Sequence, residues 1–224
     1  MELNDITDKE VDLKPLDKTL FLKENESISS TTYRNIIKST AIVVIYSAAA
    51  VASSTSLLFI PNLETITIFI FLVSFYYGFK IGLSMMLTTA TIFELFASIV
   101  YGFAGPLFFF KIFAYFINVL VASNLSKVMI ENIPASSVSD LKIKFSSRLG
   151  FMIVGIVLTL IFDLITTFYS FFLVQNVRAF VLLFIAGLPY TFFHEFTNGV
   201  IFFFVPDYLG VIKISNNISL FGSE

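Results

Sequence analysis

The chain has 224 residues, of which 57% are hydrophobic and 13% are charged, and its net charge at neutral pH is −2. Soluble domains are about half apolar and about one-quarter charged, so this composition indicates a membrane protein. The chain lacks the clustered Lys and Arg that a nucleic-acid partner requires. It also lacks Cys, which excludes disulfides, thiolate nucleophiles and Cys-ligated metals.

The N-terminal segment, residues 1–33, is acidic and polar, with eight Asp or Glu and four Lys. A signal peptide would instead begin with a basic region and continue into a short apolar run. The segment therefore predicts a cytoplasmic acidic tail that is either partly helical or disordered. We expect a transmembrane domain over residues 34–206 and a second cytoplasmic tail over residues 207–224.

The apolar stretches predict an all-α integral membrane protein, a bundle of six transmembrane helices. A helix needs about 20 apolar residues to cross about 30 Å of hydrocarbon, and Gly, Pro, Asn and charged residues mark where one helix ends. The second stretch is the shortest, so it must borrow flanking residues, thin the bilayer or lie inside the bundle. The predicted spans are Ile36–Phe59, Leu63–Tyr77, Phe79–Tyr101, Leu107–Ile130, Phe145–Leu173 and Val177–Val205.

The distribution of Lys and Arg predicts that both termini lie in the cytoplasm, because cytoplasmic loops of membrane proteins retain positive charge. This orientation makes the longest internal connection, Glu131–Lys144, a cytoplasmic joint between four helices and two. It places only Arg178 and Lys111 on the outer side. The cytoplasmic flanks then hold Arg34, Lys38, Lys80, Lys127, Lys142, Lys144, Arg148 and Lys213.

Ionisable residues within the spans are rare, and such residues usually face the bundle interior and often mark a site. They are Glu64, Glu94, Lys111, Asp163, His194 and Glu195. Residues three or four apart share a helix face, which predicts polar stripes. The stripes are Ser84, Thr88, Thr91, Glu94 and Ser98; Lys111, Tyr115 and Asn118; Thr159, Asp163, Thr166 and Ser170; and Thr191, Glu195 and Asn198 beside His194.

These stripes allow two interpretations. In the first, Glu94, Lys111 and Asp163 line a polar pocket in the outward half of the bundle. In the second, Lys111 pairs with Glu94 or Asp163, and the Ser and Thr hydroxyls bond to their own helices without any ligand. For the hydroxyl residues the second interpretation is favoured.

Two short motifs have functional and structural interpretations. Ala48 and Ala52 lie one turn apart among small residues, so they favour close approach of another helix, from this bundle or from a partner. His194 and Glu195 begin a sequence similar to the HExxH zinc motif, but the second His is missing and the chain has no other His. We therefore expect no catalytic residue, no metal site and no cofactor. The GxSxG and P-loop motifs are absent as well.

Several stretches resemble the substrate-binding S components of energy-coupling-factor (ECF) vitamin transporters, in an uncharacterised archaeal and bacterial subgroup. The resemblance extends from Ala48 to about Pro206 and rests on the order and spacing of its pieces. The matching pieces are Ile60–Thr65, Gly78–Gly82, Tyr101–Pro106, Thr159–Thr166 and Gly187–Tyr190 followed by His194–Asn198.

The resemblance implies a plasma-membrane subunit of an ABC importer that binds a vitamin or related micronutrient from outside. A transmembrane coupling protein (T component) and two cytoplasmic ATPases would be its partners. Ala48 and Ala52 would form the docking face for the coupling protein, and the first external loop, with Pro61 and Asn62, would cover the pocket. The predicted substrate-binding residues are Asn62, Glu64, Glu94, Lys111, Tyr115, Asn118, Asp163, Thr166, His194 and Asn198.

The sequence also allows two other functions. A self-sufficient carrier could use Asp163, His194 and Glu195 to relay protons, as titratable groups do in many transporters. An intramembrane hydrolase centred on His194 and Glu195 would require a bound metal. Since the chain has no Trp, stacking on a ligand would require Phe or Tyr, as in Tyr101, Tyr115 or Tyr169.

Overall fold

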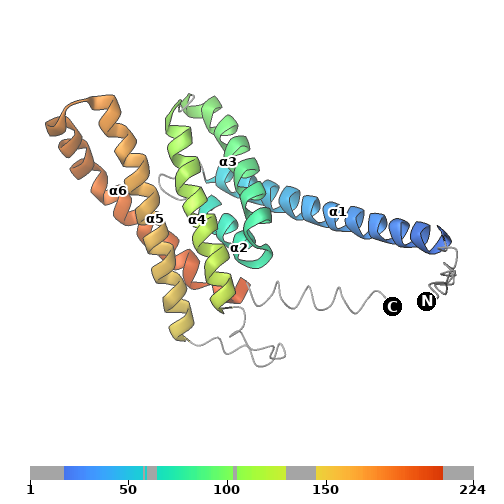
Figure 1. Ribbon diagram of the computed structural model, residues 1–224. Helices are drawn as coiled ribbons and strands as arrows, with labels where there is room; N and C mark the ends of the chain where they lie inside the picture. The colour runs from blue at the N-terminus through green and yellow to red at the C-terminus, as the bar shows by residue number, and fades with distance from the viewer. Residues whose placement is uncertain (1–17, 58, 60–64, 103–104, 130–144, 209–224) are drawn as a thin grey trace, which may run out of the picture. The chain divides into compact units, whose positions relative to one another are not determined.

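The computed structural model describes residues 18–57, 59, 65–102, 105–129 and 145–208. Within these ranges the regular structure is entirely α-helical, without a strand (Figure 1). The helices are α1 (Lys18–Ser56), α2 (Ile66–Tyr77), α3 (Phe79–Tyr101), α4 (Leu107–Met129), α5 (Phe145–Val174) and α6 (Val177–Phe203).

Five helical segments among the described residues are long and apolar enough to cross a bilayer. They indicate a multi-pass membrane protein built as a helical bundle. The sixth helix, α2, is apolar but shorter. The five segments are Thr32–Ser56, Phe79–Tyr101, Leu107–Val128, Phe145–Val174 and Val177–Tyr208.

The helix that begins the described chain is longer than the predicted first span. α1 begins at Lys18, whereas the first span was expected from Ile36, so the expected boundary of the acidic tail lies inside a helix. The physical reason is the lack of a breaker, since no Gly or Pro occurs between Lys18 and Ser56. Polar residues end an apolar span without ending a helix.

Residue contacts divide the chain into two units, residues 1–40 and residues 41–224. The first unit contains the N-terminal part of α1. The second contains the remainder of α1 and helices α2–α6, and every contact described below lies within it.

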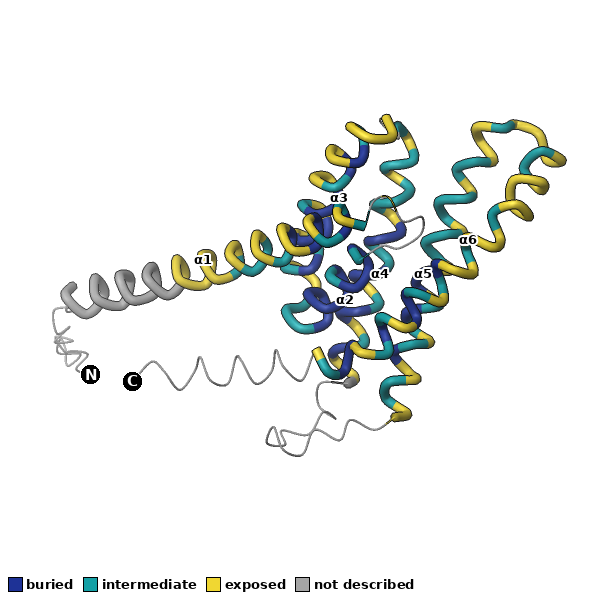
Figure 2. The backbone as a smooth tube through the Cα atoms, turned by 180° about the vertical axis from the view of Figure 1, so that it is seen from behind, coloured by how far each residue is buried: buried dark blue, intermediate teal, exposed yellow. Residues whose placement is uncertain are grey.

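Helix α2 lies inside the bundle, which was one of the three alternatives for this short segment. Its 12 residues extend about 18 Å, too little to cross the hydrocarbon layer. It contacts α3, α4 and α6, and its length is mostly dark blue in Figure 2. The buried residues are Ile66, Thr67, Ile68, Ile70, Phe71, Leu72, Val73, Ser74 and Phe75.

A tight turn joins α2 to α3. Gly78 adopts a φ of 82°, a conformation that L side chains rarely adopt, and its N–H donates to the Ser74 carbonyl at 3.1 Å. One turn later Gly82 packs so closely on Ser74 that a Cβ atom at this position would overlap it. Gly at both positions therefore keeps the short α2 against α3.

An aromatic cluster joins α2 to the last two helices. The Phe71 ring lies 5.0 Å from Phe202 and 6.0 Å from Phe151 between ring centroids. Gly155 allows α5 and α6 to approach here, because a Cβ atom on it would lie 2.5 Å from Cγ of Phe202. This packing holds one end of the α5–α6 hairpin.

The other end of this hairpin carries large exposed apolar side chains, as expected for a surface that faces lipid. Figure 2 shows few buried residues near the connection between α5 and α6. Asn176 caps α6 by accepting hydrogen bonds from the backbone N–H groups of Arg178 and Ala179 at 2.9 and 3.2 Å.

Candidate functional site

The first pair of intramembrane charges joins α3 to α4. Lys111 Nζ donates to Glu94 Oε2 at 2.9 Å, and the side chains are 25% and 7% exposed, respectively. Glu94 lies in the last third of α3 and Lys111 in the first turns of α4, so the ion pair lies toward the connection between the two helices. Of the two partners predicted for Lys111, it pairs with Glu94.

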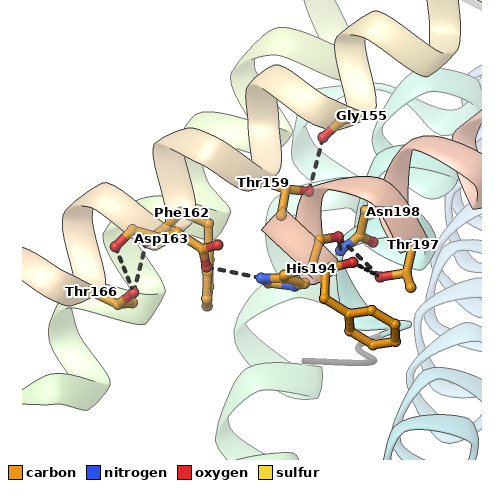
Figure 3. A network of polar contacts seen from close by, with 9 residues as sticks. Gly155, Thr159, Phe162, Asp163, Thr166, His194, Thr197 and Asn198 are labelled. Carbon is orange, nitrogen blue, oxygen red and sulfur yellow. Dashed lines mark hydrogen bonds and ion pairs between the residues drawn. The ribbon is translucent and has the colours of Figure 1, made fainter. Parts of the chain in front are cut away.

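The second pair joins α5 to α6, as Figure 3 shows. His194 Nδ1 lies 2.9 Å from Asp163 Oδ1, and the two side chains are 5% and 14% exposed. His194 also meets the ring of Phe162 edge-on, with 6.2 Å between ring centroids. The Phe162 ring lies 5.0 Å from the Tyr115 ring of α4 between centroids, so aromatic packing separates the Asp163–His194 pair from α4.

A cavity of about 310 Å³ lies between α5 and α6, with Asp163 and Glu195 in its wall. Thr167 and Thr191 are its other polar residues, and they lie one helical turn from Asp163 and Glu195, respectively. The remaining wall is apolar and consists of Leu160, Leu164, Phe184, Leu188 and Phe192. The arrangement can hold a small molecule that is apolar along most of its surface and polar at one end.

Both carboxylates of the cavity have oxygen atoms that lack a hydrogen-bond partner among the described residues. Asp163 Oδ2 is buried and has no hydrogen-bond partner among the described residues. Glu195 forms neither a salt bridge nor a hydrogen bond with the part of the chain that the structure describes. Glu195 is therefore available to a donor that enters the cavity, whereas Asp163 Oδ2 is covered by neighbouring atoms.

Tyr115 and Asn118, two of the predicted substrate-binding residues, contribute to helix packing. The Asn118 side-chain amide donates to the backbone carbonyl of Thr67 at 2.8 Å, so it connects α4 to the central helix α2. Tyr115 is buried against Phe162. Neither residue lines the α5–α6 cavity.

Thr166 and Asn198 bond to their own helices. The Thr166 hydroxyl donates to the carbonyls of Phe162 and Asp163 at 2.9 and 3.2 Å, and Asn198 Nδ2 donates to the His194 carbonyl at 3.3 Å. Bonds of this kind agree with one part of the second interpretation, in which hydroxyl groups bond to their own helices. They recur at Ser84, Thr88, Ser98 and Thr159.

The predicted loop residues Pro61, Asn62 and Glu64 lie outside the described residues, so their place near a site stays a prediction. Glu131–Lys144, the predicted cytoplasmic joint, also lies outside the described residues.

Some of the small residues of α1 pack against this chain, and others are exposed. Ser47, Ala50, Val51 and Ser54 are buried, whereas Ala48 and Ala52 are exposed. Packing against helices of this chain therefore uses the opposite side of α1.

Sequence reasoning missed the part that Thr167 plays in the cavity wall. The predicted stripe continued from Asp163 through Thr166, whereas the cavity uses Thr167, one turn after Asp163. Both spacings fit a helix face. The sequence signal that could have indicated Thr167 is the spacing of four residues from Asp163, which matches the spacing of four residues between Thr191 and Glu195 on the facing helix. Among the described residues, no three Asp, Glu or His side chains converge as a metal site would require.

Comparison of the chain with protein-family models, with curated proteins and with solved structures gives no match.

Proposed function

We propose that the chain is the solute-binding membrane subunit of a transporter, of the type represented by the S components of ECF vitamin importers. The α5–α6 cavity carries this proposal, because it holds the carboxylates of Asp163 and Glu195 within two apolar helices. An ionised side chain at the centre of a membrane helix costs about 2.5–3.5 kcal/mol on insertion scales. Asp163 is paired with His194, whereas Glu195 has no partner among the described residues, and a bound solute would supply one.

The proposed topology has six membrane segments and both termini in the cytoplasm. α2 would be the sixth segment, and its burial by α3, α4 and α6 explains how so short a helix is accommodated. The excess of Lys and Arg on the predicted inner flanks supports this orientation. Asp163 lies closer to Val174, the proposed outer end of α5, whereas Glu195 lies closer to Phe203, the proposed inner end of α6, so the cavity would lie within the depth of the membrane.

The exposed alanines of α1 support a transport complex with a coupling protein and two ATPases. Ala48 and Ala52 lie on the side of α1 that faces away from its buried residues. Small residues let a second helix approach closely in lipid. The vitamin or related micronutrient would enter from outside and cross the plasma membrane with energy from the ATPases.

A test of this complex uses the tagged chain purified under mild conditions from its native membranes. We expect a coupling protein and an ATPase pair to co-purify, and ATP-dependent solute uptake after reconstitution in liposomes. Replacing Ala48 and Ala52 together by Leu should abolish the association, because larger side chains prevent close helix approach. Ala186→Leu, at an exposed alanine of α6, is the matched control and should retain it.

A second candidate function is a proton-coupled carrier that acts alone. The hydrogen bond between Asp163 and His194, beside Glu195, favours it because these groups could exchange protons within the membrane. Uptake by the purified chain alone in liposomes, driven by a pH gradient without ATP, would establish this function. The absence of such uptake, together with ATP-dependent uptake by the complex, would establish the importer.

A further inference from the structure

We propose that the α5–α6 cavity selects a small organic cation, with an ammonium group beside Asp163 and Glu195 and an apolar or aromatic body against the rest of the wall. This inference rests on the proposed function, since it assigns a chemical class to the solute of the same cavity. It would exclude carboxylate and phosphate solutes of similar size.

The charge balance of the cavity is the first argument. Its wall contains two carboxylates and no Lys or Arg. His194 contacts Asp163 through Nδ1 but does not line the cavity. A solute anion would therefore meet two acidic groups in a medium that screens charge poorly, whereas a cation would be attracted.

The basic side chains of the neighbouring helices lie elsewhere. Lys111 is paired with Glu94, and Arg148 is paired with Asp207 at 2.8 Å. Arg178 begins α6, about 25 Å from Glu195 along the helix at the usual rise per residue. One further Lys or Arg occurs in the described parts of α4, α5 and α6. It is Lys127, which is exposed near the far end of α4.

Hydrogen bonding is the second argument. Asp163 Oδ2 is buried without a partner, and the Glu195 carboxylate also lacks one among the described residues. Ionised carboxylates only accept hydrogen bonds, so the complementary ligand group is a donor, and the charge balance of the cavity favours a cationic one. Charge-assisted N–H···O bonds are the strongest that such a group can form.

The apolar wall is the third argument. Phe184 and Phe192 contribute aromatic rings to the cavity, and three Leu side chains complete its surface. Aromatic faces attract cations, and they also pack against apolar carbon. A cavity of about 310 Å³ lies at the small end of the range for small-molecule sites, so the solute is a compact amine.

The test measures, by calorimetric titration, the binding of three probes that share a phenylethyl body to the full chain purified in nanodiscs. The probes are cationic 2-phenylethylammonium, neutral 2-phenylethanol and anionic 3-phenylpropanoate, and each is titrated separately. We expect the ammonium to bind at least about tenfold more tightly than either other probe. Glu195→Gln should lower the ammonium affinity about tenfold and leave the neutral probe unchanged. Asp207→Asn removes the same charge outside the cavity and should retain ammonium binding.

Two results would overturn the proposal. One is ammonium binding that is no tighter than binding of the neutral probe, a comparison that needs only the unmodified chain. The other is a folded Glu195→Gln protein with unchanged ammonium affinity. Cation selectivity without an ATPase partner would support this inference and contradict the proposed importer. ATP-dependent uptake of an anionic solute would support the importer and contradict the cation site.

Discussion

His194 Nδ1 lies 2.9 Å from Asp163 Oδ1, and this contact joins α6 to α5 beside the cavity that both helices line. The pair orients the Asp163 carboxylate so that one oxygen faces His194 while the other keeps no partner among the described residues. The contact therefore has a structural role and leaves one buried oxygen of Asp163 without a partner in the described part of the chain.

We expect the Asp163–His194 contact to stabilise the α5–α6 hairpin. Asp163→Ala and His194→Ala should each lower the unfolding free energy, and the double variant should lose less than the sum. Interhelical hydrogen bonds in membranes contribute about 0.6–2 kcal/mol, which is the coupling expected from the double-mutant cycle. Reversible unfolding of purified protein in mixed micelles measures it. Strictly additive losses would show that the two side chains do not interact.

The Glu94–Lys111 pair predicts that one substitution rescues another. Lys111→Met should destabilise the protein by about 2.5 kcal/mol, because it leaves the buried Glu94 carboxylate without its counter-charge. Adding Glu94→Gln should restore most of this loss. Glu94→Gln alone should cost less, since the Lys111 side chain is one-quarter exposed and its charge can reach water. Unfolding in detergent provides the comparison, and a double variant as unstable as Lys111→Met would contradict the prediction.

Two glycines of α5 should respond oppositely to Ala. Gly155→Ala should destabilise by about 1–3 kcal/mol, since the new Cβ would lie 2.5 Å from Cγ of Phe202. Gly150 is exposed and has no atom within 4 Å of the Cβ position, so Gly150→Ala should stabilise by about 0.5–1 kcal/mol through helix propensity. Thermal unfolding of both variants measures these changes in stability. Equal effects would mean that α5 and α6 do not pack closely at Gly155.

The absence of Cys makes the membrane orientation directly testable. Single cysteines at two exposed positions, Arg178→Cys and Lys127→Cys, mark the proposed outer and inner sides. A membrane-impermeant maleimide should label position 178 in intact cells and position 127 only after the cells are opened. The reverse labelling pattern would place the termini outside.

Most helix boundaries could be predicted from local signals. The predicted bounds of α3 agree with the structure at both ends, and those of α4 and α5 agree to within one residue. Charged or Gly- and Pro-containing connections interrupt the apolar stretches at these places. The start of α1 could not be found in this way, because helix formation continues through polar residues when no breaker occurs.

The polar contacts were predicted less well. Helix periodicity placed Asp163 on a polar face with Thr166, yet Thr166 bonds to its own backbone while Thr167 lines the cavity. A difference of one residue rotates a side chain by about 100° on a helix. The face that meets a neighbour depends on the packing angle between helices, which local sequence does not encode.

Composition and hydropathy were sufficient to predict a helical membrane protein, because an apolar solvent requires every backbone polar group to bond within its own helix. The same patterns identified Glu94, Lys111, Asp163 and His194 as the groups to explain. Their partners followed from packing. Lys111 meets Glu94 where α4 packs on α3, and Asp163 meets His194 where the close approach at Gly155 brings α5 and α6 together.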